Sequence, residues 1–191
     1  MLLIVHNQNA FIRKFREQYL MKAPFEHLFI EHNDPFPIQH LNEIKGVILS
    51  GGRGSPYRPL NLTANYVALM NLDVPVLGFC LSHEIIALAY LGQIDRLKDY
   101  HTGKPPITIL KKDDPIFSGI SGDVIRLKRQ HHYHVNKIPP SFTVLASSDI
   151  TPNEIIKHNK KPIYGFQAHP EVSGKDGMII MENFFQLCGL L

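Results

Sequence analysis

A cysteine stands where an apolar run meets a predicted helix, in the stretch VLGFCLSHEIIALAYLG (76–92). The N–H groups at a helix N-terminus favour the thiolate, the form of cysteine that attacks carbonyl carbon. Gly78 and Ser82 are small and flank Cys80 two positions away, as a sharp turn that exposes a nucleophile requires. Spacing alone leaves two interpretations open: Cys80 is a nucleophile, or it is a small buried apolar side chain, a common role of cysteine.

A nucleophilic cysteine needs a base, and usually a further group that orients this base. The segment GFQAHPEV (165–172) contains both residue types. Pro170 disfavours a helical conformation at His169, so we expect this segment to be extended. Side chains two positions apart on an extended segment point the same way. We therefore predict that His169 and Glu171 share a face.

Acyl transfer also needs N–H donors for the oxyanion that forms when a thiolate adds to a carbonyl group. The main-chain N–H of Leu81, directly after the cysteine, is one candidate. The stretch SGGRGSP (50–56) is the other source, because glycine lets the backbone approach a ligand closely. A plain turn is the alternative here. A phosphate loop is not indicated, since the pattern G-x-x-x-x-G-K-[ST] is absent.

Two further features have structural interpretations. The cluster HHYH (131–134) has neither the H-E-x-x-H spacing of a metal site nor an obvious cysteine or acidic partner. We expect it to form a surface or cleft-edge loop, and we predict no metal site. Cys188 falls on the apolar face of the predicted last helix and is expected to be a core residue.

The elements that would position these residues alternate along the first half of the chain. Strand-length apolar runs followed by helical periodicity predict a parallel sheet with crossover helices, with active sites at the carboxyl ends of its strands. Asn9 is a predicted helix N-cap, and Gly92 is a predicted C-cap. The predicted strands are 2–6, 26–31, 44–50 and 74–79, and the predicted helices are 10–21, 61–71, 81–92 and 175–188.

From about residue 100 to 170 the pattern changes to frequent prolines and short β segments, which indicates hairpins. We therefore predict an α/β fold of three layers: an open, mostly parallel sheet with flanking helices, plus a small antiparallel portion. We expect one domain, residues 1–191, which is an ordinary domain length. The predicted short strands are 107–110, 123–128, 142–147 and 162–168.

Composition argues against several classes of protein. Apolar residues make up 44% and charged residues 19%, as in globular chains. The net charge is only +3 and basic residues are scattered among acids, which does not favour nucleic-acid binding. Two cysteines suit a reducing compartment, and the start MLLIV is too short for a signal sequence or a membrane span. We expect a cytoplasmic protein with no membrane association.

Three motifs, in this order, together resemble the class I glutamine amidotransferases: LSGGRGSP (49–56), GFCLSHE (78–84) and GFQAHPEV (165–172). The resemblance covers almost the whole chain and implies the family's flavodoxin-like core. Within the family, two further stretches, DDPIFSGI (113–120) and HVNKIPPSFTVLASSD (134–149), and the longer KPIYGFQAHPEV (161–172), are similar to the glutaminase subunit or domain of guanosine monophosphate (GMP) synthetases.

The resemblance implies hydrolysis of the glutamine side-chain amide and delivery of ammonia to a synthetase. Cys80 would be the nucleophile, His169 the base and Glu171 its orienter. No metal or organic cofactor is implied. Four more residues would line the site: Gly52 and Leu81 as oxyanion-hole amides, and Gly51 and Glu84 as substrate contacts.

The chain contains no synthetase module, so an ATP-dependent synthetase would be a separate chain. The stretches 53–58 and 131–134 are candidates for the interface with it, and plain solvated loops are the alternative. Ammonia transfer between two chains would require the two proteins to dock.

The chain departs from the family pattern at two positions. Ser82 stands where the family usually has glycine, and serine is small enough for the turn to survive. Glu84 stands where the family usually has glutamine, and an ionised carboxylate accepts hydrogen bonds but donates none. We expect Glu84 to change substrate preference or efficiency. Two alternatives to the glutaminase stay open: a stand-alone hydrolase of γ-glutamyl amides or peptides, and a non-catalytic regulatory homologue.

Overall fold

The computed structural model describes residues 1–53, 55, 57 and 61–191. Among these residues, no helix is long and apolar enough to cross a membrane. The α-helices are α1 (Ala10–Gln18), α2 (Thr63–Asn71), α3 (Leu81–Ala89) and α4 (Lys175–Leu187). The strands are β1 (Leu2–Asn7), β2 (His27–Glu31), β3 (Gly46–Gly52), β4 (Val76–Phe79), β5 (Gln93–Gly103), β6 (Pro106–Ile109), β7 (Val124–Arg126), β8 (Arg129–Lys137), β9 (Phe142–Ser147), β10 (Ile155–His158) and β11 (Ile163–Phe166).

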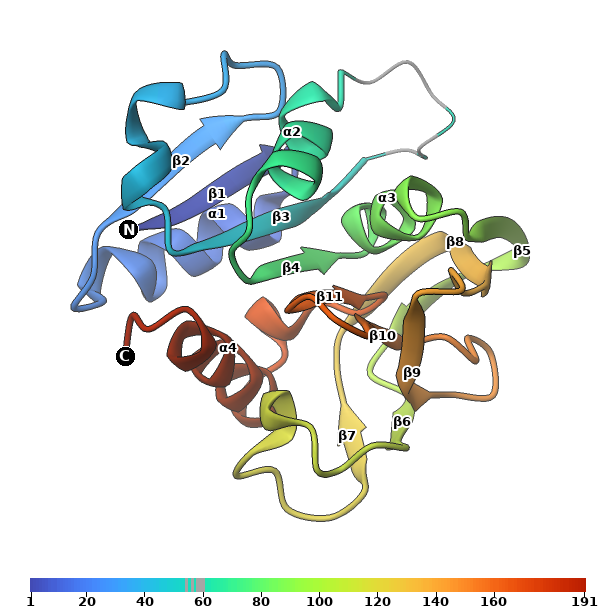
Figure 1. Cartoon of the computed structure of the whole chain (residues 1–191). Helices are drawn as coiled ribbons and strands as arrows, with labels where there is room; N and C mark the ends of the chain where they lie inside the picture. Colours follow the sequence, from blue (N-terminus) through green and yellow to red (C-terminus); the bar gives the residue numbers. More distant parts are fainter. Residues whose placement is uncertain (54, 56, 58–60) are drawn as a thin grey trace.

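The main sheet has the order β2-β1-β3-β4-β11-β10-β9-β6-β7 (Figure 1). Its first five strands pair in parallel. The remaining strands continue the same sheet in antiparallel pairs. The order β2-β1-β3-β4 is that of a flavodoxin-like sheet, in which ligands bind beyond the carboxyl ends of the strands. The predicted α/β fold is confirmed, and its antiparallel portion is joined to the parallel strands as one sheet.

Helices cover both faces of the parallel strands because successive side chains of a strand point to opposite faces. Leu2 and Ile4 of β1 pack in the core that contains α1 and α4. Leu3 and Val5 pack in the second core, with α2 and α3. A strand buried on both faces is apolar at every position, which explains the continuous apolar runs in the sequence.

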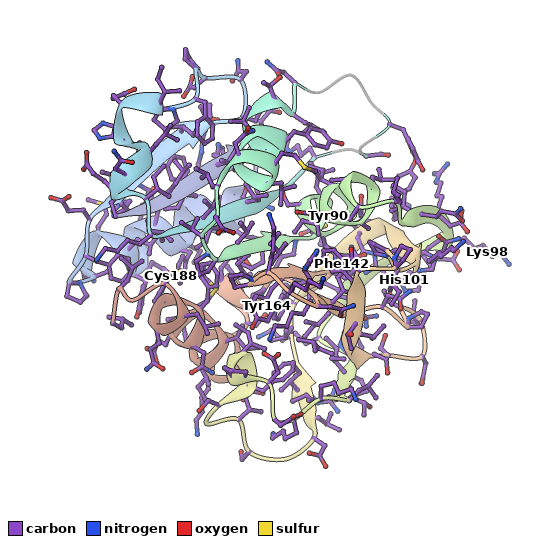
Figure 2. All side chains as sticks on the ribbon, in the orientation of Figure 1. Tyr90, Lys98, His101, Phe142, Tyr164 and Cys188 are labelled. Atoms are coloured by element: carbon purple, nitrogen blue, oxygen red, sulfur yellow. The ribbon has the colours of Figure 1, made fainter. Side chains whose placement is uncertain are left out.

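A separate two-stranded antiparallel ribbon is formed by β5 and β8. Figure 2 shows Lys98 and His101 of this ribbon near one edge of the molecule. The expectation of a loop at 131–134 is wrong, because these residues belong to β8. Two of the three buried residues of β8 are Arg129 and His131, so hydrophobic alternation does not reveal the strand. β5 was not predicted as a strand either, and Ile94 is the only residue of β5 that is buried.

The helix α3 ends at Ala89 and not at residue 92 as predicted, and its left-handed residue lies one position earlier than expected. Leu91, and not Gly92, takes the left-handed conformation, with φ +72°. The Gly92 N–H donates to the Ala87 carbonyl at 2.7 Å, as in a Schellman motif. A Cβ at Gly92 would lie 2.9 Å from the carbonyl oxygens of Ala87 and Lys137. Gly92 is therefore required by close packing of backbone and not by its φ angle.

We expect Leu91→Gly to raise the free energy of unfolding by about 0.5–1 kcal/mol, because glycine adopts the left-handed conformation without strain. Leu91 is 83% exposed, so little burial is lost. Gly92→Ala is the matched variant and should lower the free energy of unfolding by more than about 1 kcal/mol. Urea unfolding of both variants measures these changes, and a destabilised Leu91→Gly would contradict the assignment.

Candidate active site

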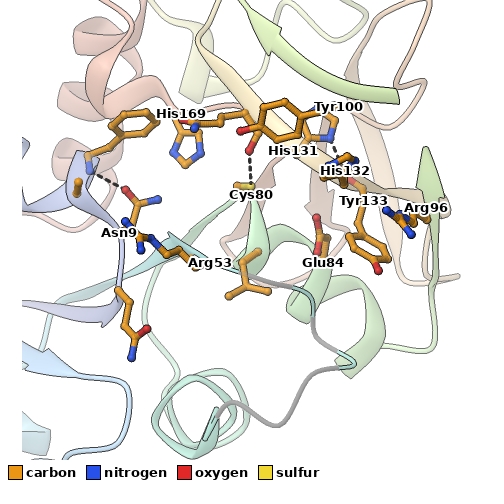
Figure 3. Close-up of a pocket in the computed structure, with 16 residues that line it drawn as sticks. Asn9, Arg53, Cys80, Glu84, Arg96, Tyr100, His131, His132, Tyr133 and His169 are labelled. Carbon is orange, nitrogen blue, oxygen red and sulfur yellow. Dashed lines mark hydrogen bonds between the residues drawn. The ribbon is translucent and has the colours of Figure 1, made fainter. Parts of the chain in front are cut away.

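The carboxyl ends of β1, β3, β4 and β11 meet at a cavity of about 560 Å³. This volume is typical of a small-molecule site, and the position is the one expected for an open α/β sheet. The ribbon of β5 and β8 forms the opposite wall. Figure 3 shows Cys80 at the centre, with Asn9 and Arg53 on one side and Glu84 and Arg96 on the other.

Cys80 occupies a strained turn between β4 and α3. Its φ of +48° and ψ of −105° lie outside the conformations that side chains normally allow, at a cost of about 1–3 kcal/mol. Gly78 has no room for a side chain, because a Cβ there would lie 2.6 Å from Ile86 Cδ1. The predicted sharp strand-to-helix turn is present, and it places Cys80 on the cavity wall.

His169 and Glu171 form a buried pair, with 2.8 Å between His169 Nδ1 and Glu171 Oε1. A carboxylate only accepts hydrogen bonds, so Nδ1 carries the hydrogen and Nε2 is left as the basic nitrogen. The pair was expected on an extended segment, and this part of the prediction is wrong. Pro170–Val172 is a 3₁₀ helix, although His169 itself is non-helical, with φ −114° and ψ 81°, as Pro170 requires.

Gly51 lies between the candidate nucleophile and the candidate base. A Cβ at Gly51 would lie 2.6 Å from His169 Cε1 and 3.4 Å from Cys80 Cβ. The two side chains therefore approach the same point, although they are far apart in the sequence. Only glycine leaves this space free.

Two main-chain amides are candidates for the predicted oxyanion hole, those of Leu81 and Gly52. The Leu81 N–H hydrogen-bonds the sulfur, which by itself lowers the pKa of the thiol. Gly52 lines the same cavity. The Gly51 carbonyl accepts a hydrogen bond from Ser50 Oγ at 2.8 Å, and the Gly52 N–H of this trans peptide points the opposite way. The Ser50 hydroxyl thus holds one orientation of the peptide between the two glycines.

A buried polar network fixes the backbone around this peptide. Asn7 Nδ2 lies within hydrogen-bond distance of the Ser50 carbonyl at 2.9 Å, Asn65 Oδ1 at 2.9 Å and Ser82 Oγ at 3.1 Å. Ser82 Oγ donates to the Ser50 carbonyl at 2.7 Å. The four side chains are buried. Ser82, where the family usually has glycine, therefore adds a satisfied hydroxyl to the network and leaves the turn intact.

Burial raises the pKa of the Cys80 thiol well above its ordinary value of 9.0, and negative charge on Glu84 and Glu171 adds to this increase. The thiol also donates to the Gln130 carbonyl, with 3.8 Å between sulfur and oxygen. The free site therefore holds a thiol, and not the thiolate that the helix N-terminus alone predicts. Attack by the sulfur requires a base to take this proton, and His169 is the candidate.

Glu84 lies in the cavity wall with 2% of its surface exposed. Gln167 Nε2 donates to Glu84 Oε1 at 3.4 Å. Glu84 Oε2 has no hydrogen-bond partner among the described residues. Burial raises the pKa of Glu84 from 4.5 to about 8, and the Gln167 hydrogen bond offsets part of this increase. At pH 7 Glu84 is therefore a neutral acid whose O–H is available as a donor to a ligand in the cavity, and it repels a Cys80 thiolate only at higher pH.

His131 and Tyr133 contribute the β8 side of the cavity. His131 Nδ1 donates to the Tyr133 carbonyl at 2.8 Å, and burial lowers the pKa of His131 to about 4, so it is neutral at pH 7. Within the described residues, no group of three or more histidine, cysteine, aspartate or glutamate side chains is placed to hold a metal ion. His131 and His132 form part of the wall of the cavity.

The remaining predictions concern Cys188, the proposed interface stretch 53–58, and two cavity residues that were not predicted as site residues. Cys188 is a core residue, as predicted, and burial raises its pKa to about 12. Arg53 lines the cavity, but Arg58, at the far end of the proposed interface stretch, lies outside the described residues. Asn9 was predicted only as a helix cap, and Gln130 was not predicted as a site residue. The position of Asn9 directly after a parallel strand was a signal for a site residue.

Residues 5–188 match the family described as glutamine amidotransferase class-I. The match spans nearly the whole chain, and the chain belongs to this family.

Two relatives indicate a narrower group within the family. A glutamine-hydrolysing GMP synthase subunit of Methanococcus aeolicus is 34% identical over 195 residues, which cover 100% of this chain and 99% of that protein. The corresponding subunit of Methanothermobacter thermautotrophicus is 33% identical over 191 residues, with 98% of each chain covered. This chain is thus similar to the glutamine-hydrolysing subunits of GMP synthases.

Solved structures share the fold. A structure from Thermoplasma acidophilum has a TM-score of 0.84 at 24% identity. The match covers 98% of this chain and 93% of the Thermoplasma acidophilum chain. A glutamine amidotransferase from Thermotoga maritima has a TM-score of 0.70 at 15% identity. The match covers 99% of this chain and 93% of the Thermotoga maritima chain. The fold class predicted from the sequence is therefore also that of these proteins.

We expect Glu84→Gln to stabilise the protein increasingly as the pH rises from about 4.5 to 8, with a constant difference above that. The folded state holds the Glu84 proton more tightly than the unfolded state does, so wild-type stability is lost over this interval. A pKa unit corresponds to about 1.4 kcal/mol, so a shift from 4.5 to about 8 gives a full difference on the order of 5 kcal/mol. Urea unfolding at several pH values measures it, and a pH-independent difference would contradict the burial of an unpaired carboxyl group.

Proposed function

We propose that the protein hydrolyses the side-chain amide of glutamine through Cys80, His169 and Glu171. One observation carries this proposal. Cys80, on its strained turn, and the buried His169–Glu171 pair lie on either side of Gly51 and approach the same point. Membership of the glutamine amidotransferase class-I family supports amide hydrolysis. The names of the relatives support glutamine as the substrate.

In the first half-reaction, His169 Nε2 takes the proton of the Cys80 thiol and the sulfur adds to the amide carbon. The negative charge on the former carbonyl oxygen is held by the N–H groups of Gly52 and Leu81, and Gly51 is a substrate contact. Glu171 holds His169 in the correct tautomer and stabilises the imidazolium. His169 then gives the proton to the leaving nitrogen, ammonia departs and a thioester remains.

In the second half-reaction, water attacks the thioester and His169 accepts a proton from it. The carbon–sulfur bond breaks, glutamate leaves and the Cys80 thiol is restored. Neither half-reaction requires a metal or an organic cofactor, because His169 handles the protons and two amides hold the oxyanion.

We infer that the ammonia is used by a separate, ATP-dependent synthetase chain in the cytoplasm, as in GMP synthesis. The support is that the relatives are named as subunits of GMP synthases, which indicates an enzyme of more than one chain. Arg53, His131 and His132 line the cavity and are the proposed interface with that chain.

A second candidate function is favoured by Glu84. An acidic side chain in the substrate pocket suits a γ-glutamyl amide or peptide that brings an ammonium group or a hydrogen-bond acceptor to it. On this alternative, the protein is a hydrolase of the same fold that acts without a partner.

A chloroketone analogue of L-glutamine should form a one-to-one adduct with the wild type, detected by intact mass. The analogue reaches a sulfur only if the pocket accepts glutamine and His169 activates the thiol. Cys80→Ala should form no adduct. Cys188→Ala should react like the wild type, because burial keeps Cys188 a thiol with a pKa of about 12. No adduct in a protein whose Cys80 still reacts with small thiol reagents would contradict glutamine recognition.

The wild type should lose glutaminase efficiency, measured as kcat/KM, by about tenfold or more above pH 8, relative to Glu84→Gln. Ionisation of Glu84 in this range removes a hydrogen-bond donor and adds a negative charge near the sulfur. Glu84→Gln keeps the donor at every pH and serves as the reference. If the two pH profiles have the same shape, Glu84 does not tune the reaction. A higher ratio of γ-glutamyl-peptide to glutamine turnover in the wild type would favour the second candidate.

A further inference from the structure

The turn between β1 and α1 brings a side-chain amide into the site. Gln8 takes a left-handed conformation, with φ +60°, which reverses the chain directly after β1. Asn9 follows in an extended conformation, with φ −105° and ψ 122°, and begins α1 as its N-cap. Its carbonyl lies 3.1 Å from His6 Nε2, which fixes the backbone from the other side.

The capping bond decides which way the amide of Asn9 faces. The Phe11 N–H donates to Asn9 Oδ1 at 2.6 Å, and only the oxygen of the amide accepts such a bond. Nδ2 is therefore directed away from the helix. Among the described residues, no acceptor lies within hydrogen-bond distance of it.

Asn9 Nδ2 faces the space between the candidate nucleophile and the candidate base. The point 2.6 Å from Nδ2 that a Gly51 Cβ would occupy is also 2.6 Å from His169 Cε1 and 3.4 Å from Cys80 Cβ. Phe11, from the same helical turn, packs edge-on against the His169 ring at 4.9 Å between centroids. The first turn of α1 thus meets His169 and supplies a polar group beside it.

In the proposed mechanism the oxygen that carries negative charge is held by the amides of Gly52 and Leu81. The group that exchanges a proton with His169 must lie beside His169, and Asn9 Nδ2 adjoins that place. A helix cap alone does not require Nδ2 at this place, because serine and aspartate cap equally well.

We propose that Asn9 is a further catalytic residue, whose Nδ2 donates a hydrogen bond to the oxygen of the water that hydrolyses the thioester. The inference rests on the proposed function. The water gives one proton to His169 Nε2, and its oxygen bonds to the acyl carbon. The carbon–sulfur bond then breaks, and the Cys80 sulfur takes the proton back from His169. One lone pair of the water oxygen attacks the acyl carbon, and the other accepts the hydrogen bond from Asn9 Nδ2. This hydrogen bond fixes the direction from which the water attacks.

The test uses Asn9→Ser, because serine keeps a capping oxygen and is neutral but has no second donor at this position. Asn9→Asp is the matched variant that keeps the cap and replaces Nδ2 by oxygen. Both should unfold within about 3 °C of the wild-type Tm. Three quantities are measured on the full chain: the rate of alkylation by the glutamine chloroketone, glutamate release from L-glutamine, and the fraction of thioester in acid-quenched protein by intact mass.

We expect Asn9→Ser to be alkylated within about twofold of the wild-type rate, because formation of the bond to sulfur does not use this water. Its glutamate release should fall about tenfold to 100-fold, and the thioester should accumulate. Asn9→Asp should lose glutamate release at least as strongly, and its negative charge near the sulfur should also slow alkylation, so the alkylation criterion applies to Asn9→Ser.

Wild-type glutamate release by Asn9→Ser would show that Asn9 is only a helix cap, and the inference would be overturned with the proposed function intact. Alkylation slowed as much as turnover would place Asn9 in binding or in the first half-reaction, which also overturns it. A wild type that is neither alkylated nor able to release glutamate would instead refute the proposed function, and the inference with it. An Asn9→Ser variant that releases glutamate slowly but accumulates no thioester would place the defect before the attack of water, and would overturn the inference alone.

Discussion

The hydrogen bonds among Asn7, Ser50, Asn65 and Ser82 constrain the edge of the sheet at which the candidate site forms. A buried polar group without a partner costs about 1–3 kcal/mol, so these bonds hold β1, β3, α2 and α3 in one relative position. Ser50 passes the constraint to the neighbouring glycine through its hydroxyl. The backbone that separates Cys80 from His169 is therefore not free to adjust, and the spacing of the candidate site depends on a network that touches no substrate.

Burial dominates the electrostatics of the cavity. It favours the neutral form of the thiol, of the acid at position 84 and of His131, so these three groups carry no charge at pH 7. A resting site of this kind avoids the large cost of isolated buried charges. Charge then has to be created during the reaction, by proton transfer within the site. The buried His169–Glu171 contact is the observed pair that can carry such a proton.

The parts of the site that were predictable are those encoded by neighbouring residues. The turn at Cys80 follows from its small flanking residues, and the contact between His169 and Glu171 follows from their spacing, although a 3₁₀ helix and not an extended strand produces it. Hydrophobicity did not predict β5 and β8 as strands, although 131–134 was expected near the site. Of the three buried residues of β8, only Val135 is apolar; Arg129 pairs with Glu154, and His131 lines the cavity, so the usual alternation is lost.

By itself the sequence determined the alternation of strands and helices, the family motifs and the identity of the candidate nucleophile, base and orienter. These features are local, because apolar periodicity, turn residues and short motifs act within a few positions of one another. Only the tertiary structure decided that Cys80 is a thiol at rest, that Glu84 holds its proton at pH 7 and that Asn9 faces His169. Each of these depends on burial and on contacts between segments far apart in the chain, and the low dielectric of the packed interior changes the chemistry of a side chain in a way that its neighbours in sequence do not reveal.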